Sequence, residues 1–201
     1  MLFDVPRETY LALCQIKSST LDQRVRVGEA AFALGCERPA RIGWYLLLDV
    51  IAMILASMLN CFCGLTLKQA VEEVRTHWQR WLELVTRVEK WQEKYPGGDP
   101  YLCIAVAWLA FEPGQSERPY RVLFGSHGEI IEALGGEAYS ISFVSVSRVL
   151  SALKANAELA GFTLPARLTV ARGEPGHKQW RDEIRAYQER AGARVKAKTL
   201  A

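Results

Sequence analysis

The stretch GWYLLLDVIAMILASMLNCFCG, residues 43–64, decides which class of fold this sequence can adopt. It is almost wholly apolar and contains one acidic residue, Asp49, while residues 50–67 carry no charge at all. That length is at the threshold for a membrane span. An Asp near the middle of a span costs about 2.5–3.5 kcal/mol, whereas each Leu or Ile returns only about 0.3–0.6 kcal/mol. Insertion of this segment into a bilayer is therefore not clearly favourable.

The segment that follows favours a buried helix over a membrane helix. Residues 67–95 carry apolar side chains at a four–three spacing, which places them along one side of a helix. This apolar stripe includes Trp78 and Trp81, whose large side chains need an apolar partner of matching area. A helix that is hydrophobic all round is such a partner. We therefore expect residues 42–63 to form the buried central helix of a helical bundle.

Two breaks rich in Pro and Gly divide the chain beyond this bundle. The first, YPGGDP at 95–100, precedes a predicted helix over residues 99–111, because Asp caps helices well and Pro is tolerated in the first turn. The second, EPGQSERP at 112–119, is the predicted domain boundary. The sequence thus predicts a helical bundle over residues 1–111 and a small α/β subdomain over residues 119–201.

The subdomain after this boundary alternates between two kinds of pattern. Short β-type runs alternate with helix-type runs that begin at capping residues or end at Gly. The predicted order β-α-β-α-β-α indicates a small sheet covered by helices, and the whole chain is predicted to be a predominantly helical α+β protein. The predicted strands are 120–124, 139–145 and 166–171, and the predicted helices are 126–136, 146–160 and 178–191.

Charge is distributed unevenly along the 201 residues, although the net charge is only +3. The chain from Arg172 onward holds eight of the 25 Lys and Arg residues and four of the 22 acids, which leaves 17 basic and 18 acidic residues before it. The basic excess at the C-terminal end predicts contact with a nucleic-acid backbone or an acidic protein partner. The residues expected to make this contact in the C-terminal helix and tail are Arg185, Arg190, Arg194, Lys196 and Lys198.

A second indication of nucleic-acid binding is the sequence SVSRVL at 145–150. It resembles the recognition helix of helix-turn-helix repressors of the LacI type. The resemblance covers only these few residues, and the preceding GGEAYSISF is longer than the tight turn of that family. It implies that Arg148 and Lys154 lie on an exposed helix face that contacts nucleic acid.

A candidate anion site combines two turns that each contain Gly and His. The turns are GSHG at 125–128 and RGEPGH at 172–177, and each leads into a predicted helix N-terminus, which attracts anions. If the sheet is parallel, both turns lie outside the carboxyl ends of its strands, where ligands bind. Neither turn matches a nucleotide-binding motif, and turn geometry or helix capping explains the same residues. The residues expected to bind a phosphate or carboxylate are Ser126, His127, Arg172, His177 and Lys178.

The five cysteines show neither CxxC pairs nor zinc-ligand spacing. They are expected to be reduced thiols in a cytosolic protein without a metal or cofactor, and the N-terminus does not read as a signal peptide.

Three classes of function remain open, and no residue pattern supports a catalytic role. The first is a non-enzymatic binding or regulatory protein that contacts nucleic acid or an acidic partner. The second is a protein–protein adaptor, inhibitor or immunity-type factor that uses Trp-rich helix faces. The third, which the sequence favours least, is a small enzyme with the anion site described above.

Overall fold

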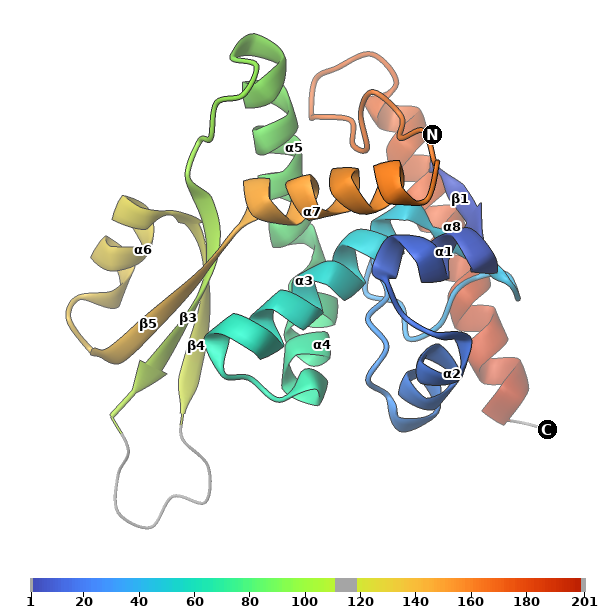
Figure 1. Ribbon diagram of the computed structural model, residues 1–201, viewed down its shortest axis with the longest axis horizontal. Coiled ribbons are helices and arrows are strands. Elements are labelled where there is room, and N and C mark those ends of the chain that lie inside the picture. The colour runs from blue at the N-terminus through green and yellow to red at the C-terminus, as the bar shows by residue number, and fades with distance from the viewer. Residues whose placement is uncertain (1, 111–118, 200–201) are drawn as a thin grey trace.

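The computed structural model describes residues 2–110 and 119–199, with side chains to residue 193. Within these ranges the chain forms eight helices and two small antiparallel sheets, which confirms the predicted helix-dominated α+β class (Figure 1). In chain order the elements are β1 (Asp4–Pro6), α1 (Arg7–Cys14), α2 (Ser18–Val27), β2 (Trp44–Leu46), α3 (Leu47–Cys63), α4 (Leu67–Thr76), α5 (Trp78–Lys94), β3 (Leu102–Leu109), β4 (Tyr120–Ser126), α6 (His127–Leu134), β5 (Ala138–Ser145), α7 (Val146–Leu159) and α8 (His177–Thr199).

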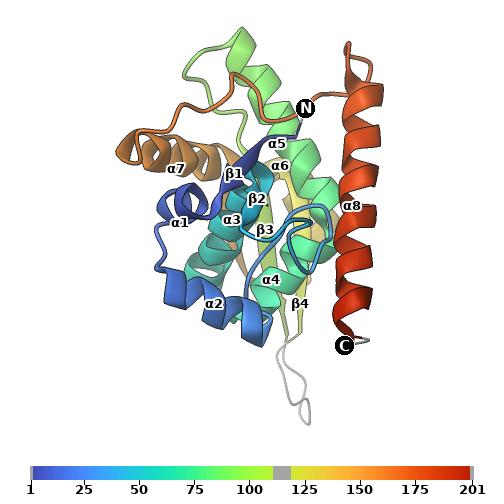
Figure 2. The same ribbon diagram turned by 90° about the vertical axis from the view of Figure 1, so that its right-hand side faces the viewer.

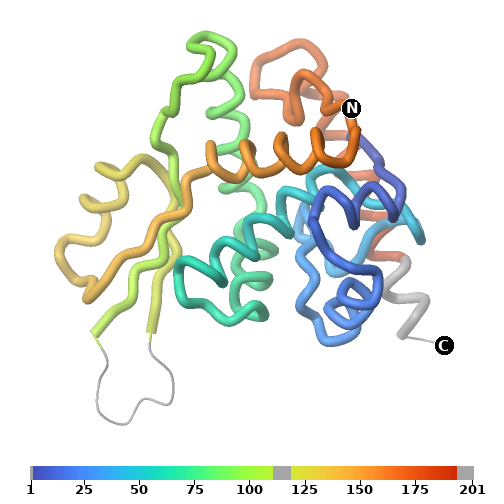
Figure 3. Tube along the Cα trace, viewed as in Figure 1, coloured from blue at the N-terminus to red at the C-terminus, as the bar shows by residue number. Residues whose placement is uncertain are grey.

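Helix α3 is the buried centre of the N-terminal half, as predicted. Every residue from Leu47 to Ala56 is buried. The helix packs against α1, α4, α7 and β5, and it runs through the middle of the traced chain (Figure 3). The predicted helix over 42–63 starts late, because residues 44–46 pair with β1 as strand β2. Within the described part of the chain, no helix combines the length and apolarity that crossing a membrane requires.

Asp49 is fully buried in the first turn of α3 and is held by backbone donors. Its Oδ1 accepts a hydrogen bond from the Ala33 N–H at 2.8 Å, and its Oδ2 accepts one from the Leu46 N–H at 2.8 Å. Burial nevertheless raises the pKa of this carboxyl to about 7, because the charged form loses its hydration. The one acid in the apolar stretch therefore ties the loop before β2 to the central helix.

The helix predicted over 67–95 is two helices, α4 and α5, with a break at His77. His77 has φ −102° and ψ 26°, outside the helical range. In an unbroken helix the Val74 carbonyl would accept from the N–H four residues later. Here it accepts from the indole N–H of Trp81 at 2.8 Å. The apolar stripe continues through both helices, which is why its spacing did not reveal the break.

The helix predicted over 99–111 is wrong as far as the structure describes it, because residues 102–109 form strand β3. This strand is the centre of a three-stranded sheet of order β4-β3-β5, and both of its pairings are antiparallel. Asp99 does not cap a helix. Its Oδ1 accepts from the N–H of Tyr101 at 2.8 Å, which makes a local turn before the strand.

The sequence of β3 hides its strand character because both of its faces are buried. Ile104 and Val106 join the main core, whereas Ala105 and Ala107 pack under α6 with Ile130. A strand covered on both sides lacks the alternation of apolar and polar residues that marks a half-exposed strand. The apolar residues 102–109, which follow Asp99 and Pro100, therefore match the sequence pattern of a capped helix.

The strand predicted over 166–171 is also wrong, since this segment is an irregular loop. Its backbone donors are satisfied by a side chain: the Glu89 carboxylate accepts from the N–H groups of Leu168 at 2.7 Å and Thr169 at 3.1 Å. The other predicted strands and helices of this half are present, and α8 extends beyond the predicted 178–191. The C-terminal sheet is antiparallel, so the parallel arrangement assumed for the anion site does not hold.

The predicted boundary at 112–119 lies, except for Pro119, outside the described residues. Strand β3 precedes it and pairs with β4 and β5, which both follow it. Helix α8 crosses back to the first half and lies beside α5 (Figure 2). The division into two domains stays a prediction.

Candidate functional site

The structure separates the residues of the predicted anion site into two groups. Ser126 and His127 lie where β4 meets α6, on the far side of the sheet from the loop that leads into α8 (Figure 1). Arg172 and His177 both line a groove beside α8, and Lys178 lies on α8 outside it. The fold therefore does not bring all five residues to one site, but it does place Arg172 and His177 in the same groove.

The polar groups at the start of α6 are used inside the fold. The Oε2 of Glu129 accepts from the backbone N–H of Ser126 at 2.6 Å, and this contact holds the pKa of Glu129 below its usual range. His127 Nε2 lies 3.4 Å from Cys103 Sγ, and its ring packs edge-on against Phe143 at 4.5 Å between centroids. A carboxylate of the protein itself therefore lies at the N-terminus of α6.

A groove of about 630 Å³ runs between α5 and α8, and we call it the α5–α8 groove. The two helices lie side by side and run in opposite directions (Figure 2). At one end Lys90 lies 3.2 Å from Glu174, and at the other end Gln188 donates to the Leu34 carbonyl at 2.6 Å. The lining residues are Trp78, Gln79, Leu82, Glu83, Thr86, Arg87, Lys90, Val170, Ala171, Arg172, His177, Trp180, Arg181, Ile184, Arg185 and Gln188.

Basic side chains dominate the walls of the α5–α8 groove. Five Lys or Arg residues line it, against a single acid, Glu83. Lys90 is paired with Glu174, but the other four form no ion pair with any acid among the described side chains. Such an excess of basic side chains along a groove attracts anions from solution. The four unpaired cations are Arg87, Arg172, Arg181 and Arg185.

The floor of the same groove is apolar. Leu82 of α5 and Ile184 of α8, which are 5% and 7% exposed, both line it. Trp180 is also buried, and its indole N–H has no hydrogen-bond partner in the part of the chain that the structure describes. Trp78, the first residue of α5, also lines the groove and is half-buried. Apolar surface below and cations above suit a ligand that has both flat apolar and anionic parts.

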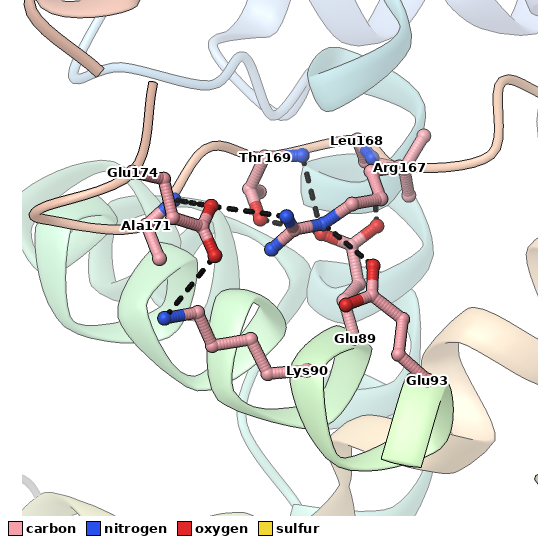
Figure 4. A network of polar contacts seen from close by, with 8 residues as sticks. All are labelled: Glu89, Lys90, Glu93, Arg167, Leu168, Thr169, Ala171 and Glu174. Atoms are coloured by element: carbon pink, nitrogen blue, oxygen red, sulfur yellow. Dashed lines mark hydrogen bonds and ion pairs between the residues drawn. The ribbon is translucent and has the colours of Figure 1, made fainter. Parts of the chain in front are cut away.

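A polar network fixes the loop that carries Arg172 (Figure 4). Glu89 on α5 accepts from two backbone N–H groups of this loop and from the hydroxyl of Thr169. Its pKa is raised, because burial outweighs these donors. The carboxylate thus replaces the strand partner that the loop lacks.

The next turn of the loop is held by Glu174 (Figure 4). It accepts from the N–H of Ala171 at 2.9 Å and from Arg167 Nη1 at 3.0 Å. The Ala171 N–H, together with Arg167 and Lys90, lowers the pKa of Glu174 to about 2. Arg167 also lies 2.9 Å from Glu93 of α5. Arg172 is therefore placed at the groove by contacts that bind its loop to α5.

The remaining residues predicted to contact nucleic acid lie on separate surfaces. Arg185 lines the α5–α8 groove, whereas Arg190 is exposed on α8 outside it. Arg148 is exposed on α7, and Lys154 on the same helix donates to Gln92 at 3.4 Å. The side chains of Arg194, Lys196 and Lys198 lie outside the described residues.

Helix α7 does not belong to a helix-turn-helix unit. Strand β5 ends at Ser145 and α7 begins at Val146, so no preceding helix packs across it through a short turn. The inner face of α7 is buried, including Val149 and Leu153. The resemblance of residues 145–150 to a recognition helix is thus confined to sequence.

Sequence reasoning missed three basic residues of the groove: Arg87, Lys90 and Arg181. The pattern of residues 67–95 places Arg87 and Lys90 on a solvated helix face, which is correct for an isolated helix. The spacing of Arg181 and Arg185, four residues apart, was a usable signal, since it places both on one side of a helix.

The described residues do not form a cluster typical of a metal centre. No group of three or more His, Cys, Asp or Glu side chains among them is placed to hold a metal ion. The Cys103 thiol beside His127 is buried, and burial together with Asp99 raises its pKa. A protonated, inaccessible thiol is a poor nucleophile.

Comparison with known proteins does not assign this chain to a family. A scan against protein-family models finds no match. A search of the curated proteins finds no sequence with significant similarity. The function has to be argued from the groove itself.

Proposed function

We propose that this chain is a non-enzymatic protein that binds nucleic acid in the α5–α8 groove. The observation that carries the proposal is that Arg87, Arg172, Arg181 and Arg185 line one groove, and none of them forms an ion pair among the described side chains. Arginine suits phosphate because its planar guanidinium donates two parallel hydrogen bonds. Each phosphate that is neutralised releases counterions, which is the main source of affinity for nucleic acid.

The placement of charged residues on α8 favours binding in the groove over binding to the whole surface of α8. Arg181 and Arg185 face the groove, while the acids Asp182, Glu183 and Glu189 do not line it. One of these acids, Glu183, accepts from the backbone N–H of Leu2 on another side of the helix. If the ligand were attracted to α8 as a whole, the cations would not need to face the groove and the acids would not need to face away from it.

The proposal includes a cytosolic location. The five cysteines are free, and four of them have raised pKa values because they are wholly or partly buried. Free thiols in a chain with five cysteines suit a reducing compartment.

Two matched double variants test the proposal. R181A/R185A removes two cations from the groove, and K178A/R190A removes two exposed cations from the same helix outside it. We expect the first to weaken binding of a labelled oligonucleotide strand about tenfold or more and to lower the salt slope by about 1.4, because two phosphate contacts are lost. Fluorescence anisotropy over a range of about 50 to 200 mM salt measures both quantities.

The control variant K178A/R190A is expected to bind almost as well as the unmodified chain. Equal losses in both variants would show that the whole basic helix, and not the groove, attracts the ligand. Failure of the unmodified chain to bind any nucleic acid at low salt would reject the proposed function.

A further inference from the structure

We infer that the α5–α8 groove holds one unpaired strand of nucleic acid, with bases on the apolar floor and phosphates against the arginines. This inference rests on the proposed function and specifies its ligand. It follows from the apolar residues that line the groove and from the placement of cations on both of its walls.

The groove follows the length of α5. Trp78 and Lys90, which line its two ends on α5, are twelve residues apart and so are separated by about 18 Å along the helix. A ligand that fills the groove would therefore lie along α5.

The cations lie on both sides of the groove. Arg87 lies on the α5 wall. Arg181 and Arg185 lie on the α8 wall, and their backbone positions are about 6 Å apart along the axis of α8. Proteins that read duplex DNA usually present a convex helix to the major groove. Here the arginines flank a concave groove, so a duplex would reach the rim and leave the floor empty.

The floor offers surfaces that only unpaired bases can use. Trp78 is half-buried and lines the groove, and aromatic side chains are the usual stacking platforms for single strands. Leu82 and Ile184 extend the apolar surface. In a duplex the base faces are stacked on one another and cannot meet this floor.

Four probes of equal length test the inference with the full chain. They are an oligothymidine strand of about 15 nucleotides, its duplex with the complement, a strand in which every base is replaced by an abasic linker, and a polyglutamate peptide. Affinity is measured by anisotropy at a single salt concentration. We expect the thymidine strand to bind at least about fivefold more tightly than the abasic strand or the duplex, because each stacked base adds affinity.

The variant W78L provides a second readout. It keeps an apolar side chain and removes the indole, so we expect it to weaken binding of the thymidine strand while leaving the abasic strand unaffected. The probes compared on the unmodified chain decide the question even if this variant folds poorly.

The outcomes separate the inference from the function on which it rests. Equal binding of the duplex, or of the abasic strand, overturns the inference and leaves nucleic-acid binding in place. Binding of polyglutamate but of no nucleic acid, or no binding of any probe, overturns the proposed function as well.

Discussion

At the scale of single residues, Asp49 is the one acid in the apolar stretch, and it accepts two backbone hydrogen bonds inside the core. An acid inside an apolar stretch argues against a membrane span, and it also needs partners inside a protein. Those partners are two backbone N–H groups from the loop and strand that precede α3. The carboxylate therefore replaces hydrogen bonds that the loop backbone cannot make elsewhere in the core.

The stability of the fold should depend on pH through Asp49. Its pKa is about 7 in the folded chain and 3.8 in the unfolded chain, so between these values the folded state binds the proton more tightly. The free energy of unfolding should fall as pH rises, by roughly 2–3 kcal/mol between about pH 5 and 7.5 from this group alone. Urea unfolding at the two pH values measures the change.

The variant D49N is the control for that slope. It cannot titrate, so its unfolding free energy should change much less over the same pH range. It should also be less stable at low pH, by about 1–3 kcal/mol, because an amide has only one oxygen for the two N–H donors. The same slope in both proteins would assign the pH dependence to other groups, of which Glu89 also has a raised pKa.

At the scale of elements, local signals were predicted well and fully buried segments were not. The capping boxes at the starts of α4 and α6 are signals of this local kind, because each involves residues only three positions apart. Residues 102–109 were predicted as part of a helix and form strand β3, whereas residues 166–171 were predicted as a strand and form a loop. Each structure depends on a partner, which is a pair of neighbouring strands for β3 and the Glu89 carboxylate for the loop.

The variant E89Q should loosen the loop over 166–172. A glutamine side chain has one oxygen where Glu89 uses two, so one of its backbone donors loses its acceptor, at a cost of about 1–3 kcal/mol. We expect faster hydrogen exchange at the amides of Leu168 and Thr169. Binding in the groove should also weaken, since Arg172 follows this loop.

The matched control is E93Q on the same helix. Glu93 forms an ion pair with the Arg167 side chain and accepts no backbone hydrogen bond shown for this loop, so its change should leave the two amide exchange rates nearly unaltered. Equal exchange in the unmodified chain and E89Q would mean that Glu89 does not hold the loop.

At the scale of the whole molecule, α8 joins the two ends of the chain. Tyr187 accepts a hydrogen bond from the Ala40 N–H at 3.2 Å, and Gln188 donates to the Leu34 carbonyl at 2.6 Å. Trp180 and Ile184 pack into the main core. The groove therefore exists only because the last helix returns to the N-terminal half.

A chain cut after Ala171 should be strongly destabilised. It loses the buried side chains Trp180, Ile184 and Tyr187, each worth about 1.5–3 kcal/mol, against a total stability that is typically about 5–15 kcal/mol. We expect a lower urea midpoint and increased binding of an apolar dye. A chain cut after Ala193 keeps these side chains and should unfold near the original midpoint. Similar stability of both truncations would show that α8 is not part of the core.

The central helix, the helix-dominated α+β class, the capped helix starts and the basic C-terminal end could all be predicted without coordinates. These features depend on composition or on residues within one or two turns of each other, so local physical chemistry is sufficient to predict them. Three-dimensional packing was needed to establish that residues 102–109 are a strand, that the sheet is antiparallel and that α5 and α8 form a groove. Arg87 and Arg181 are far apart in the chain, in different helices. They line the same groove because the buried side chains of α5 and α8 pack against the rest of the fold. A short window of sequence does not contain that information.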